Sequence, residues 1–265
     1  MNDETFLVYG SDKKMISCYE KLKSYGYKAE ILNSEVNFDI SAYNYIILPI
    51  PTIANSKING TNISLSEFVA SVSDNQIVFC GNLNPSAYKN FYSYYNENFL
   101  IKNSRLTAQG VLKLISMNVE EDFNSLKVVV IGYGRCGKAV CKLLKGCGMN
   151  VTSVSRRNVK RVLAQDDGFC TGDFDYLNNT IEHFDIIINT VPVNIIYKES
   201  ISKLSQKNIF IEIASKPYGF DISEYDVYNF KYILGESLPG RFTPVSAGYN
   251  IADTVLDILK EAEYG

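Results

Sequence analysis

Histidine and tryptophan are the scarcest residues of this chain: among 265 residues there is one histidine, His183, and no tryptophan. Six cysteines are present, but no two of them stand in a Cys-x-x-Cys pair. Zinc sites and histidine-based catalytic sites need several such side chains close together, so we expect no metal site and no Ser-His-Asp triad. The cysteines are expected to be reduced thiols that behave as small apolar residues.

An excess of basic charge is also absent, because 26 basic side chains face 29 acidic ones and the net charge is −3. A nucleic-acid-binding surface needs a basic patch, so we expect no nucleic acid partner. No run of 18 apolar residues occurs, which argues against a membrane-spanning helix. The first ten residues, MNDETFLVYG, lack the pattern of a signal peptide, and a cytoplasmic location is expected.

The segment Leu126–Ser155 has the pattern of a dinucleotide-binding unit. A continuous β-branched run, Val128–Ile131, predicts a strand buried on both faces, and a glycine-rich turn and a helical pattern follow it. In this motif Gly132 allows the tight turn, Gly134 lets the backbone approach a pyrophosphate, and Gly137 lets the helix lie close to the strand. The alternative is an αβ domain whose glycine turn binds nothing. The turn residues expected to contact the cofactor are Gly132, Tyr133, Gly134, Arg135, Cys136 and Gly137.

The end of the second predicted strand of this unit indicates which cofactor binds. NAD-binding units usually carry an acid there for the ribose 2′-hydroxyl, whereas this chain has Ser155, Arg156 and Arg157. Guanidinium groups suit a 2′-phosphate by charge and by forked hydrogen bonds. The sequence therefore favours NADP over NAD. The two arginines could instead form a solvated start to the next helix.

Strands and helices alternate over the whole chain, which predicts an α/β protein with parallel sheets. We expect an N-terminal αβ domain over residues 1–103, a crossing helix and connector over 104–124, and a Rossmann-type, doubly wound NADP-binding domain over 125–245. A C-terminal helix over 246–264 closes the fold and could pack on the first domain. The aromatic stretch 87–97 is expected to be a surface helix.

Six predicted strands with crossovers give the second domain the doubly wound strand order 3-2-1-4-5-6. Ligands bind at the carboxyl edge of such sheets. The loops at that edge, over residues 189–192, 214–219 and 235–244, should therefore face the nicotinamide and the substrate. The first loop adds Asn189, Thr190, Val191 and Pro192 to the predicted cofactor site.

Five motifs, in one order along the chain, resemble those of a known enzyme family. They are NSRLTAQG, GYGRCGKA, INTVP, EIASKPYGFD and LPGRFTPVSAG. The chain resembles the A subunits of dipicolinate synthase from spore-forming bacteria, well over about residues 100–260 and in outline over the first domain. The resemblance implies NADP-dependent oxidation of a dihydrodipicolinate-type precursor to dipicolinate. The partner that it implies is a flavoprotein-like B subunit, and the implied location is the mother-cell cytoplasm during sporulation.

The substrate in this family is a small dicarboxylate whose oxidation creates an aromatic ring. A strong base is therefore not compulsory, and the sequence offers no clear catalytic residue. Two carboxylates require cations. The family tends to carry a cationic side chain at the position where this chain has Val245. Arg241 lies nearby and could replace it. The side chains expected to bind the substrate are Lys216, Arg241, Asn103, Ser104, Arg105 and Thr107, each of which could instead be a solvated or capping residue.

Two other functions fit the same residues. The chain could be another NADP-dependent dehydrogenase of the 2-hydroxyacid type, although that class works with a histidine base and His183 precedes a strand, on the edge opposite the cofactor. It could also be a non-catalytic, NADP-sensing regulatory subunit. The segment Phe91–Phe99 is a candidate surface for a partner subunit, and a homo-oligomer is compatible with the sequence.

Overall fold

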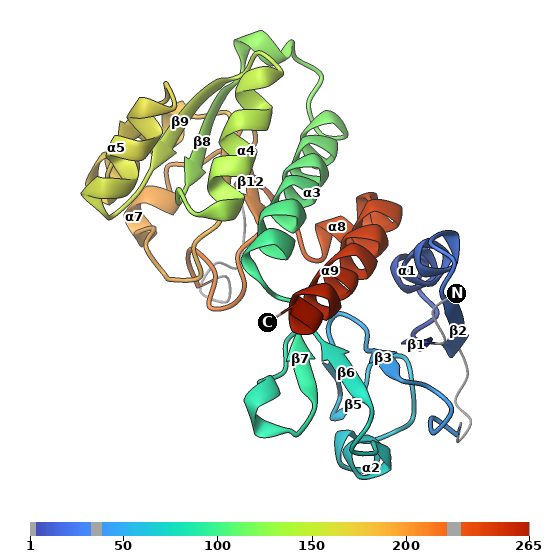
Figure 1. Cartoon of the computed structure of the whole chain (residues 1–265). Coiled ribbons are helices and arrows are strands. Elements are labelled where there is room, and N and C mark those ends of the chain that lie inside the picture. The colour runs from blue at the N-terminus through green and yellow to red at the C-terminus, as the bar shows by residue number, and fades with distance from the viewer. Residues whose placement is uncertain (1–3, 33–38, 222–228, 265) are drawn as a thin grey trace. The chain divides into compact units, whose positions relative to one another are not determined.

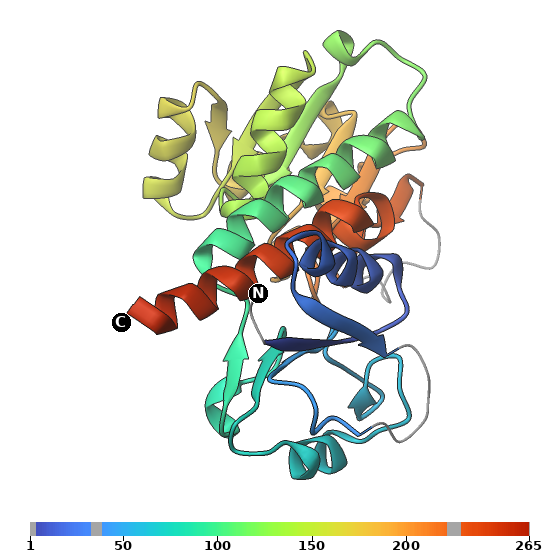
Figure 2. The same cartoon turned by 45° about the vertical axis from the view of Figure 1, so that its right-hand side comes forward.

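The chain divides into two compact units, one formed by residues 1–103 with 243–265 and the other by residues 104–242. Each unit contains a parallel β-sheet with helices packed on it (Figure 1, Figure 2). The predicted fold class, an α/β protein with two αβ domains of which the second is of the Rossmann type, is confirmed. The computed structural model describes residues 4–32, 39–221 and 229–264.

The first unit is built on a five-stranded parallel sheet in the order β2-β1-β3-β6-β7. Its strand β1 is apolar on both faces, with Phe6, Leu7 and Val8 fully buried, as its continuous apolar sequence predicts. The elements are β1 (Thr5–Tyr9), α1 (Lys13–Ser24), β2 (Lys28–Leu32), β3 (Tyr45–Ile47), β4 (Ile53–Ala54), β5 (Lys57–Ile58), α2 (Leu65–Ser71), β6 (Ile77–Cys80), η1 (Pro85–Ala87), β7 (Phe91–Ser93) and the C-terminal α9 (Pro244–Tyr264).

The C-terminal helix α9 packs on α1 within this first unit. Its apolar side, which includes Ile251 and Val255, joins the core around Met15. The two helices approach closely at Gly248, because a Cβ there would collide with the carbonyl oxygen of Lys14. A glycine is therefore required at this point of the helix contact.

The predicted surface helix over residues 87–97 is wrong. The segment contains the 3₁₀ turn η1 and the edge strand β7, whose Phe91 pairs with Val78 of β6. The Phe91 side chain is buried, and its ring lies 6.3 Å from that of Phe68. Aromatic side chains suit a half-buried sheet surface as well as a helix, and here packing against the sheet decides between them.

Helix α3 (Glu97–Ser116) begins earlier than the predicted crossing helix and runs from the first unit into the second. The side chain of Asn96 caps its start by accepting from the Phe99 N–H at 2.8 Å. Four predicted substrate residues therefore lie inside a helix and not in a loop before it: Asn103, Ser104, Arg105 and Thr107.

The second unit has six parallel strands in the order β10-β9-β8-β11-β12-β13, which is the predicted doubly wound order. Ile131 pairs in register with Asn189, and Asn189 with Glu212. These three residues end their strands and form a row along the carboxyl edge of the sheet. The elements are η2 (Phe123–Ser125), β8 (Lys127–Ile131), α4 (Arg135–Gly146), β9 (Asn150–Val154), α5 (Asn158–Asp166), β10 (Cys170–Gly172), α6 (Phe174–Thr180), η3 (Ile181–His183), β11 (Ile186–Asn189), α7 (Lys198–Ile201), β12 (Ile209–Glu212), β13 (Lys231–Leu234) and α8 (Leu238–Phe242).

Helices cover both faces of this second sheet. One apolar core joins α3, α4 and α5 to the sheet through side chains such as Val111, Val140 and Ala164. Another joins α6 and α7 to the opposite face through Leu177 and Ile201. Figure 1 and Figure 2 both show α3 running beside α4 on this sheet. The doubly wound arrangement leaves the carboxyl edge, with its loops, as the place where a ligand can approach.

The predicted loop over residues 235–244 contains the short helix α8, so this prediction is wrong in part. Leu238 of α8 is buried against α3, where a Cβ at Gly110 would lie 2.6 Å from the Leu238 Cβ. Lys113 of α3 donates to the carbonyl oxygen of Phe242 at 2.9 Å. These tertiary contacts hold the segment as a helix.

Within the part of the chain that the structure describes, no helix is long and apolar enough to cross a bilayer. The same residues form no group of three or more His, Cys, Asp and Glu side chains suited to hold a metal ion. All six cysteines are free thiols, and Cys18, Cys80 and Cys141 are buried. Burial raises the pKa of the Cys141 thiol to about 12, so this cysteine behaves as an apolar residue.

Candidate dinucleotide site

The glycine turn after β8 is shaped by the neighbouring strand β11. Gly132 has a φ of +98°, in the left-handed region that favours glycine. A Cβ at this position would lie 2.5 Å from Thr190 Oγ1 and 2.7 Å from Val191 Cγ2. Thr190 in turn donates its hydroxyl to the carbonyl oxygen of Ile131 at 2.7 Å. The turn is thus closed on one side by the two residues that follow β11.

Helix α4 starts directly from this turn and lies close to it. A Cβ at Gly137 would collide with the carbonyl oxygen of Gly132, so only glycine allows this approach. No side chain caps the helix at Gly134, and a Cβ there would meet no atom within 4 Å. The first N–H groups of a helix have no intrahelical acceptor, and together with the helix dipole they bind anions. The geometry therefore suits a pyrophosphate at Gly134.

The side chains between the glycines differ in what they can contact. Tyr133 is buried in the core, and its hydroxyl donates to Asp167 Oδ2 at 2.7 Å. Only the backbone of Tyr133 can therefore contact a cofactor. Cys136 is half-buried, and burial raises the pKa of its thiol, which makes it a poor nucleophile. Arg135 is exposed at the first position of α4.

A pocket of about 200 Å³ opens beside the glycine turn, at the carboxyl end of β9. Ser155 contributes a buried hydroxyl oxygen that has no hydrogen-bond partner among the described residues. Three basic side chains line the pocket, which matches the charge of a phosphate. Its lining residues are Gly132, Ser155, Arg156, Arg157, Lys160, Phe174, Val191, Val193 and Ile195.

Two basic residues of this region were not predicted from the sequence. Lys160 lines the pocket from the first turn of α5, three residues after Arg157, a spacing that places both on one side of a helix. Arg161 acts on the backbone instead: its Nη1 donates to the carbonyl oxygens of Ser155 at 2.8 Å and Arg156 at 2.9 Å. Arg161 thus fixes the turn from which Arg156 and Arg157 extend.

Asn189 was predicted to contact the cofactor, but its side chain is fully buried. Its Nδ2 donates to both carboxylate oxygens of Glu212 and to the carbonyl oxygen of Val191, each at 2.9 Å. Its Oδ1 accepts from the Val191 N–H at 3.0 Å. The amide therefore holds the loop after β11 in shape. Val191 borders the pocket, whereas Pro192 is exposed.

Glu212 is a buried carboxylate that the sequence-based prediction missed. Its Oε1 accepts from the Ala214 N–H at 2.8 Å and its Oε2 from the Gly219 N–H at 2.9 Å. Burial raises the pKa of the carboxyl group, while these hydrogen bonds and that of Asn189 lower it. A signal was present in the sequence, since Glu212 is the charged residue of an otherwise apolar strand.

The two predicted substrate cations lie in neighbouring segments of the second unit. Lys216 is exposed in the loop after β12, and Arg241 is exposed on α8. Tyr218, in the same loop as Lys216, donates its hydroxyl to Glu236 Oε1 at 3.3 Å. Arg241 Nη1 donates to the carbonyl oxygen of Glu236 at 3.4 Å. Glu236 thus links the two segments that carry the cations.

The predicted substrate residues of α3 have different environments. Ser104 is buried, Arg105 is exposed, and Thr107 is half-buried. Asn103 is half-buried and is the last residue of that segment of the first unit. Val245 is 39% exposed on α9.

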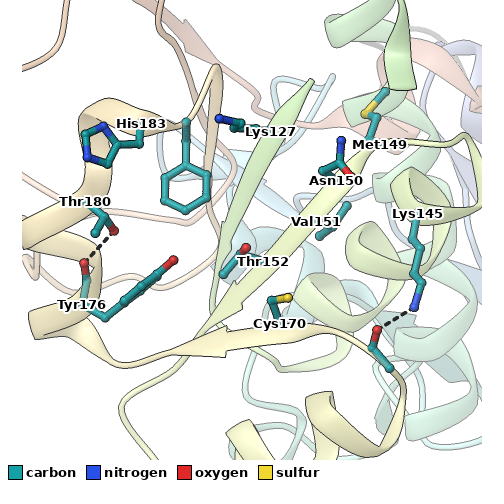
Figure 3. Close-up of a pocket in the computed structure, with 12 residues that line it drawn as sticks. Lys127, Lys145, Met149, Asn150, Val151, Thr152, Cys170, Tyr176, Thr180 and His183 are labelled. Carbon is teal, nitrogen blue, oxygen red and sulfur yellow. Dashed lines mark hydrogen bonds between the residues drawn. The ribbon is translucent and has the colours of Figure 1, made fainter. Parts of the chain in front are cut away.

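A second pocket, of about 440 Å³, lies at the amino edge of the same sheet, where β8 and β9 begin. His183 and Lys127 line it, together with Cys170 of β10 (Figure 3). Lys145, also in this pocket, donates its Nζ to the carbonyl oxygen of Gly168 at 2.6 Å. The histidine is therefore at the opposite end of the strands from the glycine turn and cannot act as a base for a substrate bound there.

Residues 102–216, which include the glycine turn and β11, match the family model of the D-isomer specific 2-hydroxyacid dehydrogenase NAD binding domain. Over 170 residues, or 64% of this chain, the sequence is 26% identical to the A subunit of dipicolinate synthase from Bacillus subtilis (strain 168). The resemblance to this subunit of dipicolinate synthase is confirmed. The aligned segment spans 57% of the length of the B. subtilis protein.

Solved structures extend the similarity in fold to the whole chain. The dipicolinate synthase A chain from Bacillus subtilis has a TM-score of 0.84 at 21% identity, over 100% of this chain and 98% of its own. A transhydrogenase from Sinorhizobium meliloti has a TM-score of 0.72 at 12% identity, over 98% of this chain and 94% of its own. The match to an NAD binding domain supports a nicotinamide dinucleotide as the cofactor.

Gly134→Val should abolish dinucleotide binding and leave the protein folded. The new side chain enters open space beside the first turn of α4, where a pyrophosphate would lie. Titration calorimetry with NADP and NAD measures the loss, and circular dichroism checks the fold. The matched control is Gly146→Val at the other end of the same helix, where a Cβ also meets no atom within 4 Å. Unchanged affinity in Gly134→Val would mean that the glycine turn is not the cofactor site.

Proposed function

We propose that this chain is the NADP-dependent oxidoreductase subunit of a dipicolinate-forming enzyme. In this proposal it oxidises a dihydrodipicolinate-type precursor to dipicolinate and acts with a second subunit, in the cytoplasm. The observation that carries the choice of NADP is the pocket beside the glycine turn, where Ser155, Arg156, Arg157 and Lys160 replace the acid of an NAD site. The choice of substrate rests on the similarity to the A subunit of dipicolinate synthase.

The residues of the site suggest how the reaction proceeds. The substrate loses a hydride and a proton, and a bound NADP⁺ supplies the hydride acceptor, so that the products are dipicolinate, NADPH and H⁺. The gain of aromaticity drives the reaction, so this chain needs chiefly to position the ring. Lys216 and Arg241 are exposed cations on adjacent segments and are proposed to bind the two carboxylates. Ser104, Arg105 and Thr107 of α3, with Asn103, are further candidates.

The second subunit is proposed to contact the aromatic segment Phe91–Phe99 of the first unit. Within it, Phe91, Tyr94 and Phe99 are buried, whereas Tyr92 is 46% and Tyr95 36% exposed. Exposed tyrosines are favoured at protein interfaces because they are large and amphipathic. The contact is therefore proposed to use the side chains of Tyr92 and Tyr95.

A dehydrogenase of the 2-hydroxyacid type is the second candidate, and the match of residues 102–216 to the NAD binding domain of that class favours it. The position of His183 at the amino edge of the sheet weighs against it, since that class works with a histidine base. An NADP-sensing subunit without catalytic activity is a third candidate, which turnover by the purified protein would reject.

The first test concerns cofactor choice. NADP should bind more tightly than NAD, and Arg156→Ala should weaken NADP binding by about 1.5–3 kcal/mol, the cost of one charge-assisted contact, with little effect on NAD. Calorimetric titration of both nucleotides against both proteins measures this. Lys207→Ala, which removes an exposed charge before β12, is the control. Equal affinities of the wild type for NADP and NAD would contradict the assignment.

The second test concerns the substrate. The condensation product of pyruvate and aspartate semialdehyde is supplied with NADP, and NADPH formation and the ultraviolet absorbance of dipicolinate are followed with and without the partner subunit. Lys216→Ala and Arg241→Ala should raise the KM for the dicarboxylate and leave NADP affinity nearly unchanged. If both subunits together form no aromatic product, the substrate assignment is wrong. Full turnover by this chain alone would reject only the need for a partner.

A further inference from the structure

A glutamate is unusual at position 212, because this position is buried at the end of an otherwise apolar strand. Its side chain is fully buried at the end of β12, and three N–H donors surround it: the Asn189 amide and the backbones of Ala214 and Gly219. A protonated carboxyl group would need an acceptor for its proton, whereas donors alone favour the carboxylate. The hydrogen bonds thus favour the negatively charged form, against burial, which raises the pKa of the carboxyl group.

No cation compensates this charge within the described part of the chain. Burial is the largest influence on the pKa of Glu212 and raises it, and no basic side chain contributes to lowering it. Burying an unpaired charge costs free energy. A residue that breaks a stability rule in this way is most often retained for function.

The sheet register places Glu212 relative to the cofactor site. Ile131, Asn189 and Glu212 lie side by side at the carboxyl edge, so Glu212 is two strands, or about 10 Å, from the start of the glycine turn. The pocket with Arg156 and Arg157 lies on the other side of that turn, at β9. A dinucleotide lies across this edge. If its 2′-phosphate end is at β9, its nicotinamide end extends over β11 and β12.

We infer that Glu212 is a positioning residue whose buried negative charge makes the site prefer the oxidised, positively charged nicotinamide over the reduced, neutral one. This inference rests on the proposed function, since it requires the dinucleotide at the carboxyl edge. Two effects combine at Glu212. Its hydrogen bonds to Asn189, Ala214 and Gly219 hold the loops after β11 and β12, and its charge acts over a short distance through a poorly screened interior. An enzyme that binds NADP⁺ more tightly than NADPH also releases its reduced product readily.

The test compares the dissociation constants of NADP⁺ and NADPH. The wild type should bind NADP⁺ more tightly than NADPH. Glu212→Gln keeps the size of the side chain but removes the charge and one of the two acceptor oxygens, so it should weaken NADP⁺ binding about tenfold more than NADPH binding. A residue with a purely structural role would affect both nucleotides equally. Glu199→Gln makes the same charge change at an exposed position of α7 and should leave the ratio of the two constants unaltered.

Glu212→Asp separates the charge from the loop geometry. It retains the negative charge on a shorter side chain, so both affinities should fall together and their ratio should stay near that of the wild type. The inference is wrong if Glu212→Gln has the wild-type ratio. It is also wrong if the wild type binds NADPH as tightly as NADP⁺ or more tightly, a result that does not depend on any variant folding. Failure of the wild type to bind either dinucleotide would instead reject the proposed function, and the inference with it.

Discussion

A chain of close contacts runs from the buried carboxylate of Glu212 to the start of helix α4. The Glu212 carboxylate accepts from the side-chain amide of Asn189. The same amide donates to the carbonyl oxygen of Val191, and its oxygen accepts from the Val191 N–H. The Val191 side chain closes on Gly132, whose carbonyl oxygen meets Gly137 at the start of α4. At Gly132 and Gly137 these contacts exclude any larger residue. The position of the helix start that is proposed to bind the pyrophosphate therefore depends on the Glu212 carboxylate, two strands away.

The fold was largely predictable because its signals are local. Continuous apolar strands, a glycine turn and helical spacing each lie within a few neighbouring residues, and the strand order follows from the crossover rule. These local signals gave wrong predictions where tertiary contacts determine the secondary structure. The aromatic segment 87–97 fits a helix as well as a strand, and pairing with β6 makes it a strand. Likewise, α8 forms where a loop was predicted because Leu238 packs on α3 at Gly110.

The candidate site was predictable at its glycines and less so elsewhere. Gly132 and Gly137 are fixed by motif spacing, and the structure gives each a contact that only glycine permits. The role of the Asn189 side chain was not predictable, because a single sequence does not reveal that it binds Glu212, 23 residues later. Arg161 was missed for a similar reason, since two of its hydrogen bonds go to backbone carbonyl oxygens, which the residue types do not reveal.

The two edges of the second sheet carry pockets that differ in size and in chemistry. The amino edge holds the larger pocket, of about 440 Å³, with His183 beside it, whereas the pocket at the carboxyl edge measures about 200 Å³. The smaller one adjoins an uncapped helix start, an unpartnered hydroxyl group and three cationic side chains. These are the groups that recognise phosphates, and the larger pocket offers no such combination of groups.

The measurement that tests this account most directly is a crystal structure of the chain with NADP⁺ bound. The account predicts the pyrophosphate at the first turn of α4 beside Gly134 and the 2′-phosphate within hydrogen-bond distance of Arg156 or Arg157. It also predicts the nicotinamide over the ends of β11 and β12, close to Glu212. A dinucleotide bound at the amino edge beside His183, or one whose 2′-phosphate points away from both arginines, would contradict it.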